Sequence, residues 1–320
     1  MRILFTGASS FTGCWFATEL ARAGHEGVAT FTRTSPDDYA EPIRRERVKR
    51  VARRCQTVYS CRFGNERFVD VIRDEGVDLL CHHAADVKDY KNPDFDVAAA
   101  LANNTKNIRS VLEAIATNHT GRLVLTGSVF EGGEGAGSEG LPHISPYGLS
   151  KSLTAQAFAY FCNATGVPWG KFVVPNPFGP WEEPRFTAYL MRAWSEGQTP
   201  AIRTPDYVRD NIPVSLLAAA YVDFVRRDFV TTTVLRARPS GYVESQGAFA
   251  ERLAHEVRER TGWDCALDHG RQTDFTEPLV RVNTDRVLNL YPGWSESSAW
   301  DAMVDFYVRS VKPCNSLTVA

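Results

Sequence analysis

Residues 2–13 read RILFTGASSFTG, and this stretch decides the fold. Its first five residues form a short apolar run, which is typical of a buried strand. A helical pattern of apolar and small residues starts at Phe11 and stops at Gly24, the residue type that most often ends a helix. Glycine at a strand-to-helix turn lets the backbone approach a pyrophosphate, whose charge the helix N-terminus favours. The stretch therefore predicts a dinucleotide-binding turn.

Strands and helices alternate outward from this turn as far as about residue 175. We expect apolar strands at residues 28–32, 57–60, 77–82, 122–126 and 171–174. We expect helices at about residues 42–54, 66–74 and 95–117, and a further helix from Pro146. Apolar strands that alternate with helices are typical of a parallel sheet covered on both faces. The prediction is an α/β fold with a doubly wound parallel sheet of the Rossmann type.

The pattern changes after Pro175, where prolines cluster and the alternation becomes irregular. We expect a smaller, mostly C-terminal lobe that binds the substrate. The dinucleotide-binding domain would comprise residues 1–175 plus about 206–236, and the lobe about 176–205 and 237–320. The Gly-rich segment 131–140 is expected to be a flexible active-site loop, or else a plain surface loop.

The composition argues against several classes of function. The chain has 320 residues, of which 43% are hydrophobic and 23% charged, and its formal net charge is −2. This balance does not favour binding to nucleic acid or to a membrane surface, and no apolar run approaches the roughly 20 residues of a membrane span. The seven cysteines are scattered without a C-x-x-C pair, so neither a metal site nor a disulfide framework is expected. With no signal peptide recognised, we expect a cytoplasmic protein.

The turn at residues 6–13 resembles the T-G-x-x-G-x-x-G fingerprint of the extended short-chain dehydrogenases/reductases, the NAD-dependent epimerase/dehydratase family. Gly7 and Gly13 match its outer glycines, and Ser10 replaces the middle one. Residues 82–85 (HHAA) resemble the strand end that borders the cofactor in this family. Paired metal-binding histidines are the alternative, but adjacent strand residues face opposite ways, so no metal is expected. The resemblance implies cofactor contacts from Gly7, Ser9, Ser10, Phe11, Thr12, Gly13, Thr32, Arg33, Phe63, His82, Ala84, Ala85, Tyr147, Lys151 and Pro175.

The end of the second strand reports on the choice of cofactor. NAD-specific sites usually place an acidic residue there for the ribose hydroxyls, whereas this chain has Thr32 followed by Arg33. A guanidinium can pair with the 2′-phosphate of NADP, which a carboxylate would repel. We therefore expect NADP(H) to be preferred, with NAD(H) possible. The alternative is that Arg33 is only a surface charge.

Tyr147 and Lys151 form the predicted catalytic pair. Tyr147 alone among eleven tyrosines has Lys four residues later, and residues at this spacing share a helix face. A nearby cation lowers the pKa of a phenol from about 10, which suits proton exchange with an alcohol or a carbonyl. The resemblance adds Thr126, whose family counterpart polarises the substrate oxygen, with Ser128 in reserve. Gly127-Ser128 replaces the Asp-Glu that family dehydratases use to eliminate water, which argues against dehydration.

The substrate side carries two further partial matches to the family. Residues 173–180 (VVPNPFGP) resemble its R-x-x-N-x-x-G-P run, with Asn176 in place and Val173 where the family has Arg. Arg209 resembles the Arg of an R-D motif that pairs with nucleotide phosphates, and Arg185 is a weaker phosphate candidate. Together with Ser128, these residues imply a nucleotide-sugar substrate.

The sequence leaves several functions open. The first interpretation is NADPH-dependent reduction of a keto-sugar nucleotide, because Arg33 favours the cell's usual reductant. One alternative is a nucleotide-sugar 4-epimerase with bound NAD. The others are a reductase of small non-nucleotide ketones or aldehydes and a non-catalytic dinucleotide-sensing module. The family resemblance also implies a homodimer.

Overall fold

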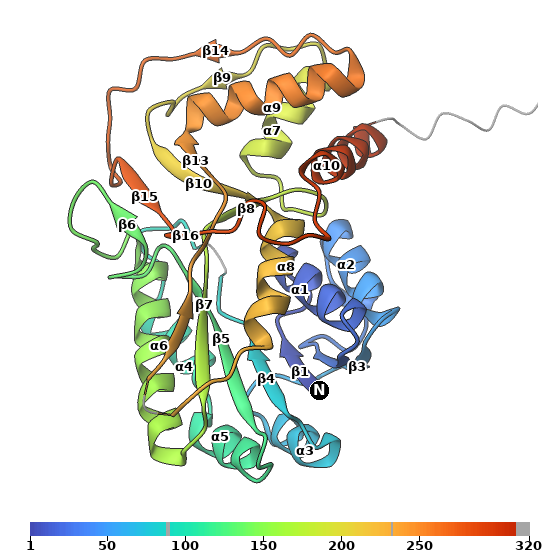
Figure 1. Cartoon of the computed structure of the whole chain (residues 1–320), viewed down its shortest axis with the longest axis vertical. Helices are drawn as coiled ribbons and strands as arrows, with labels where there is room; N and C mark the ends of the chain where they lie inside the picture. The colour runs from blue at the N-terminus through green and yellow to red at the C-terminus, as the bar shows by residue number, and fades with distance from the viewer. Residues whose placement is uncertain (88–89, 232, 312–320) are drawn as a thin grey trace, which may run out of the picture.

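A seven-stranded sheet forms the centre of the computed structural model, which describes residues 1–87, 90–231 and 233–311 (Figure 1). Its strand pairs are all parallel, in the order β11-β7-β5-β4-β1-β2-β3. The strands are β1 (Arg2–Thr6), β2 (Glu26–Thr30), β3 (Gln56–Val58), β4 (Leu79–His82), β5 (Arg122–Ser128), β7 (Trp169–Val174) and β11 (Leu235–Ala237). The predicted doubly wound parallel sheet is confirmed.

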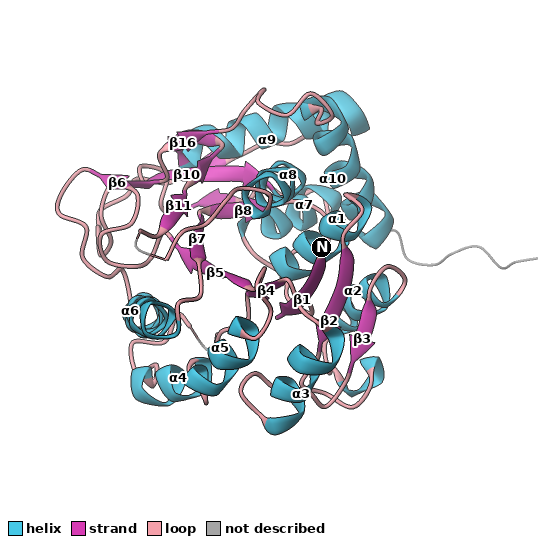
Figure 2. Ribbon diagram, turned by 60° about the horizontal axis from the view of Figure 1, so that its bottom comes forward, coloured by secondary structure: helices cyan, strands magenta, loops and turns pink. Residues whose placement is uncertain are grey.

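Helices cover both faces of this sheet (Figure 2). Because successive strand residues point to opposite faces, the sheet divides its apolar side chains between two cores. Phe5 and Val124 pack on the face covered by α1 (Phe11–Arg22), α2 (Pro42–Ala52) and α8 (Val214–Val225). Leu4 and Leu125 pack on the face covered by α3 (Glu66–Glu75), α5 (Ile108–Ala116) and α6 (Pro146–Thr165). In the described part of the chain, none of the helices combines the length and apolarity that a membrane crossing requires.

The helix expected over 95–117 is wrong in one respect, because the chain forms two helices there. They are α4 (Val97–Asn104) and α5, and a turn at residues 105–107 separates them. Asn107 has a φ of 50°, a left-handed conformation that asparagine adopts more readily than most residues. Its Nδ2 donates to the Gly64 carbonyl at 2.7 Å, so a tertiary contact stabilises the break. The apolar period continues across the turn, which is why the pattern reads as one helix.

A second lobe is built around a five-stranded sheet. Strands β13, β10, β15 and β6 follow one another, and β8 also pairs with β10. They are β6 (Ala136–Gly137), β8 (Asn176–Phe178), β10 (Val208–Pro213), β13 (Tyr242–Ser245) and β15 (Val280–Val282). Helices α7 (Phe186–Ser195), α9 (Gln246–Thr261) and α10 (Glu296–Val311) complete the lobe, at the top of Figure 1. Short elements also occur: η1 (Pro36–Asp38), and the pairs β9 (Ala201–Ile202) with β14 (Asp268–His269) and β12 (Pro239–Ser240) with β16 (Asp285–Arg286).

The loop after β8 ties the second lobe to the first. The indole Nε1 of Trp15 on α1 donates to the Pro180 carbonyl at 3.0 Å. Arg47 on α2 is buried, donates through Nε to the Trp181 carbonyl at 2.7 Å, and pairs with Glu183 at 2.6 Å. A charged hydrogen bond from a buried guanidinium is costly to lose, so this loop is fixed against the first lobe.

Candidate active site

The Gly-rich turn lies where β1 and β4 are neighbours, the point at which the strand order reverses and open α/β sheets bind ligands. Gly7 has a φ of +78°, and a Cβ there would lie 2.8 Å from the Ala84 nitrogen. A Cβ on Gly13 would collide with the Gly7 carbonyl oxygen. Both positions therefore require glycine, which lets the turn pack tightly against residues 83–84 at the N-terminus of α1. This is the cradle that a pyrophosphate needs.

Ser10 does not obstruct this cradle, although it replaces the middle glycine of the fingerprint. It is the N-cap of α1, and its Oγ accepts from the Gly13 nitrogen at 3.1 Å. Its hydroxyl donates to the Gly7 carbonyl at 2.9 Å. The side chain is therefore occupied inside the turn, and the substitution is compatible with a bound dinucleotide.

A second arginine reaches the turn from α2. The Nε of Arg44 lies 3.2 Å from the Ser9 Oγ, and its guanidinium lies over the Tyr39 ring, 5.2 Å from the centroid. Arg33 and Thr32 are exposed just beyond the end of β2. The sequence identifies Arg33 but not Arg44, because only the folded chain brings α2 against the turn.

The two neighbouring histidines face different surroundings. His82 is buried, its Nδ1 is 3.0 Å from the Thr6 Oγ1, and its ring lies 4.1 Å from that of Phe63. His83, absent from the expected cofactor contacts, lies beneath the Gly-rich turn, and its Nδ1 is 3.0 Å from the Thr126 Oγ1. Within the described residues, no group of three or more His, Cys, Asp or Glu could hold a metal ion.

Tyr147 and Lys151 lie on the first turns of α6, which Ser145 caps by accepting from the Gly148 nitrogen. The Nζ of Lys151 donates to the Thr126 carbonyl at 2.5 Å, so two of the three predicted catalytic residues meet at the end of β5. Burial lowers the pKa of Lys151 to about 8, against the opposing effect of Glu131. Burial and the Glu131 carboxylate raise the pKa of Tyr147. This is the opposite of the lowering expected from Lys151, because burial outweighs the lowering by Arg185.

Aromatic side chains surround the Tyr147 ring. The rings of Tyr90 and Phe95 lie 5.6 and 6.1 Å from it, both in edge contacts. The loop that carries them is held at its start, where the Asp86 nitrogen donates to Asn104 at 2.9 Å. Asn104 in turn donates to Thr154 on α6 at 3.2 Å. Asn104 thus links this loop to α6.

The segment 131–140 is anchored by charge, in contrast to the flexible loop expected. Lys171 on β7 donates to Glu131 at 2.5 Å and to Glu134 at 2.8 Å, and all three side chains are buried. Arg238 pairs with Glu134 at 2.8 Å. Glu131 also accepts from the Ser128 nitrogen at 2.7 Å, directly beside Gly127. These contacts fix the segment against β5, next to Tyr147 and Lys151.

The predicted substrate residues lie in different surroundings. Asn176 begins β8, and Arg185 is the N-cap of α7 with 42% of its side chain exposed. Arg185 lowers the pKa of Tyr147, so its charge acts on the active site. Arg209 lies over the Tyr207 ring, pairs with Glu277 at 2.8 Å and donates to three carbonyls. Arg209 therefore already has a full set of partners within the chain.

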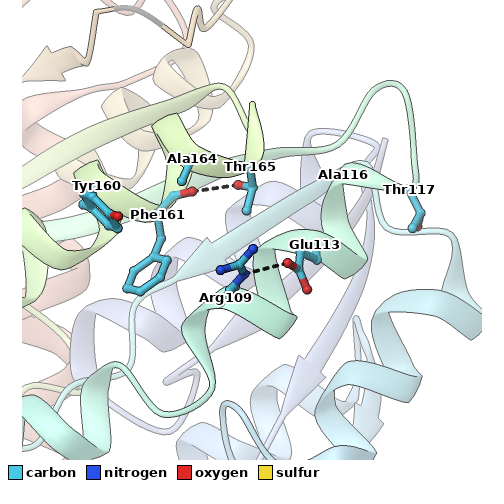
Figure 3. Close-up of a pocket in the computed structure, with 8 residues that line it drawn as sticks. All are labelled: Arg109, Glu113, Ala116, Thr117, Tyr160, Phe161, Ala164 and Thr165. Carbon is cyan, nitrogen blue, oxygen red and sulfur yellow. Dashed lines mark hydrogen bonds and ion pairs between the residues drawn. The ribbon is translucent and has the colours of Figure 1, made fainter.

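A shallow hollow elsewhere on the surface has none of these residues. It lies between α5 and α6 and is drawn in Figure 3. Arg109 and Glu113 pair along its α5 side at 2.8 Å, and the exposed Tyr160 of α6 borders it. The hollow is therefore a feature of a helical face, separate from the catalytic centre.

The comparison with protein families agrees with this geometry. Residues 3–229 match the sequence profile of the NAD dependent epimerase/dehydratase family. The chain belongs to this family. Tyr147, Lys151 and the Gly-rich turn all lie within the matched region, so this family member is an enzyme of the extended short-chain dehydrogenase/reductase type. No curated protein gives a significant match.

Solved structures of epimerases share the fold of this family member across both lobes. A variant of UDP-glucuronic acid 4-epimerase from Bacillus cereus, in complex with a UDP-sugar analogue and NAD, has a TM-score of 0.74 at 16% identity, covering 97% of this chain and 100% of that one. UDP-glucose 4-epimerase from Thermotoga maritima, with UDP-glucose, has a TM-score of 0.72 at 17% identity, covering 98% and 100%. UDP-N-acetylglucosamine 4-epimerase from Methanobrevibacter ruminantium has a TM-score of 0.69 at 15% identity, covering 97% and 98%.

The buried charges around Lys171 generate a prediction about stability. Lys171→Met would leave Glu131 and Glu134 buried with one cation fewer, so we expect a loss of about 3–5 kcal/mol in the free energy of unfolding. Urea denaturation followed by circular dichroism measures it. Lys49→Met, which removes an exposed ion pair on α2, is the control and should change stability by less than about 1 kcal/mol. A similar small change for both variants would show that the buried pairs do not anchor the segment.

Proposed function

We propose that the protein is a nucleotide-sugar 4-epimerase, acting on a UDP-sugar. The observation that carries the proposal is the contact of Lys151 with Thr126 at the end of β5, with Tyr147 four residues before Lys151 on the same helix and a tight glycine turn at the end of β1. Two 4-epimerases that share this fold are complexes with UDP-glucose or with a UDP-sugar analogue. We infer the same class of substrate here, and we place epimerisation ahead of the net reduction that the sequence favours.

The residues of the turn fit a nicotinamide dinucleotide. Gly7 and Gly13 leave room for the pyrophosphate, Ser10 is turned inward, and the N-terminus of α1 faces the space. When bound, the nicotinamide supplies the hydride acceptor and donor of both half-reactions. Tyr147 takes the proton of the sugar hydroxyl and later returns it, while Lys151 offers its ammonium to the ribose. Asn176 and Arg185 are proposed to hold the diphosphate, and Arg209 can join them only by releasing Glu277.

Net reduction of a keto-sugar nucleotide by NADPH is the second candidate. Two observations favour it: residues 31–35, directly after β2, include Arg33 and no acid, and Arg44 contacts Ser9 of the turn. A 2′-phosphate between them would gain two charge-assisted contacts. Preference for NADP(H) is therefore part of the proposal for either reaction.

The cofactor prediction uses three variants. Wild type should bind NADPH more tightly than NADH, and Arg33→Ala and Arg44→Ala should each weaken NADPH binding about tenfold while leaving NADH binding unchanged, because only a phosphate contact is lost. Fluorescence titration of protein freed of bound dinucleotide measures both affinities. Arg53→Ala, an exposed arginine at the other end of α2, is the control. Tighter binding of NADH by the wild type would remove both arginines from the site.

The reaction prediction rests on whether the cofactor leaves. Wild type should interconvert the 4-epimers of a UDP-hexose without added cofactor, since oxidation and reduction regenerate it. Tyr147→Phe should lower the rate by about 10²–10⁴-fold, because a positioned acid/base is removed. Tyr160→Phe, the same change on an exposed ring, should keep the wild-type rate. Chromatography of the products measures the rate. Stoichiometric NADPH consumption with a 4-keto-sugar nucleotide, and no interconversion, would establish the reductase instead.

A homodimer through α5 and α6 is also proposed. Tyr160 is 68% exposed, and the hollow of Figure 3 lies between these helices. Tyr160→Glu would bury charge in such an interface, so it should convert a dimer to a monomer in light scattering, with circular dichroism unchanged. The outcome against the proposal is a wild-type protein that is monomeric at micromolar concentration.

A further inference from the structure

His83 joins two parts of the site that no sequence motif connects. Its Nε2 lies 3.1 Å from both the Ser10 Oγ and the Thr12 Oγ1, which belong to the Gly-rich turn and the start of α1. Its Nδ1 lies 3.0 Å from the Thr126 Oγ1 on β5. The rings of Phe5 and Phe16 lie 5.7 and 5.4 Å away and hold the imidazole in place. One ring thus spans the distance from the phosphate cradle to the catalytic threonine.

The hydrogen bonds of Ser10 determine which nitrogen of His83 carries the proton. A serine hydroxyl has one hydrogen, and Ser10 donates it to the Gly7 carbonyl. Ser10 can therefore only accept from His83, so Nε2 is the protonated nitrogen. Burial and the ammonium of Lys151 lower the pKa of His83 to about 3, so the ring is neutral and Nδ1 has a free lone pair. It follows that the Thr126 hydroxyl donates to Nδ1.

We propose that His83 is a positioning residue that holds the Thr126 hydroxyl hydrogen toward its own ring and leaves the oxygen of Thr126 as a hydrogen-bond acceptor for the substrate. The proposal rests on the proposed function, which makes Thr126 a catalytic residue. It also couples Thr126 to the turn, because the same ring donates to Ser10 and Thr12. A displacement of the turn therefore moves the ring and, with it, Thr126.

This arrangement bears on the chemical class of the substrate. An acceptor at Thr126 matches a sugar hydroxyl beside the reacting one, because the single hydrogen of the reacting hydroxyl goes to Tyr147. A ketone oxygen can only accept, so it would need the Thr126 hydroxyl to turn away from His83. The ground state is therefore matched to a sugar with a free hydroxyl beside the reacting carbon, and Tyr147 remains the group that exchanges the proton of the reacting oxygen.

The first test reads the tautomer directly. Protein labelled with ¹⁵N-histidine has seven imidazoles, and the signals of His83 are those that vanish in His83→Leu. At pH 7 these signals should report a neutral ring with protonated Nε2 and unprotonated Nδ1. A neutral ring with the proton on Nδ1 would overturn the proposal, as would a doubly protonated ring. The measurement needs neither substrate nor cofactor.

The second test separates the two ends of the ring. The side-chain amide of His83→Asn occupies the place of Nδ1 and can still meet Thr126, whereas that of His83→Gln reaches the place of Nε2 and can still meet Ser10. We expect His83→Asn to keep kcat and weaken NADPH binding about tenfold, about the effect of one lost hydrogen bond. We expect His83→Gln to keep NADPH affinity and lower kcat about tenfold. His83→Leu should show both losses.

Equal behaviour of the Asn and Gln variants would overturn the proposal, because a purely structural histidine would not split kcat from cofactor affinity. Failure of the proposed function is a different result: the wild type would convert no UDP-hexose, while the tautomer and the NADPH affinities of the variants could still be measured. A wild-type kcat and NADPH affinity in His83→Leu would also overturn the proposal.

Discussion

The hydroxyl of Thr6 fastens the end of β1 to the end of β4, and the site is arranged around this attachment. It accepts from the backbone nitrogens of His83 and Ala84 at 3.1 and 3.0 Å, and it meets the Nδ1 of His82 at 3.0 Å. The backbone of Ala84 is thereby brought so close to Gly7 that no side chain fits between them. The path of the Gly-rich turn, the placement of His83 and the direction of the α1 N-terminus all follow from this contact.

Local patterns in the sequence were sufficient for the sheet, because buried parallel strands are apolar throughout and the turns between them contain glycine or proline. Tyr147 and Lys151 could be paired for the same reason, since their spacing is a property of one helix. The break at Asn107 could not be predicted, because it depends on a contact with Gly64, 43 residues away in the chain. The roles of His83 and Arg44 likewise depend on contacts between distant segments, and the local pattern of apolar and polar residues does not reveal such contacts.

Charge is distributed unevenly around the catalytic pair. At the Gly-rich turn, Arg44 brings a positive charge to Ser9, and Arg33 is exposed just beyond the end of β2. Beneath the pair, Glu131 and Glu134 are balanced by Lys171 and Arg238, so the buried cluster is close to neutral. A long-range field toward an anionic ligand therefore arises from the surface arginines, whereas the buried charges act on Tyr147 and Lys151 over a short distance.

The chain crosses between the two lobes more than once. Strand β6 leaves the first lobe to pair with β15, and β11 returns from the second lobe to the edge of the large sheet beside β7. Neither lobe is therefore encoded by one continuous stretch of the gene. A truncation near residue 175 would remove β11 from the large sheet and α8 from its face, and it would leave β6 without its partner β15. The two halves are therefore unsuited to separate expression. For the same reason, the substrate lobe cannot be exchanged for that of another family member by a single crossover.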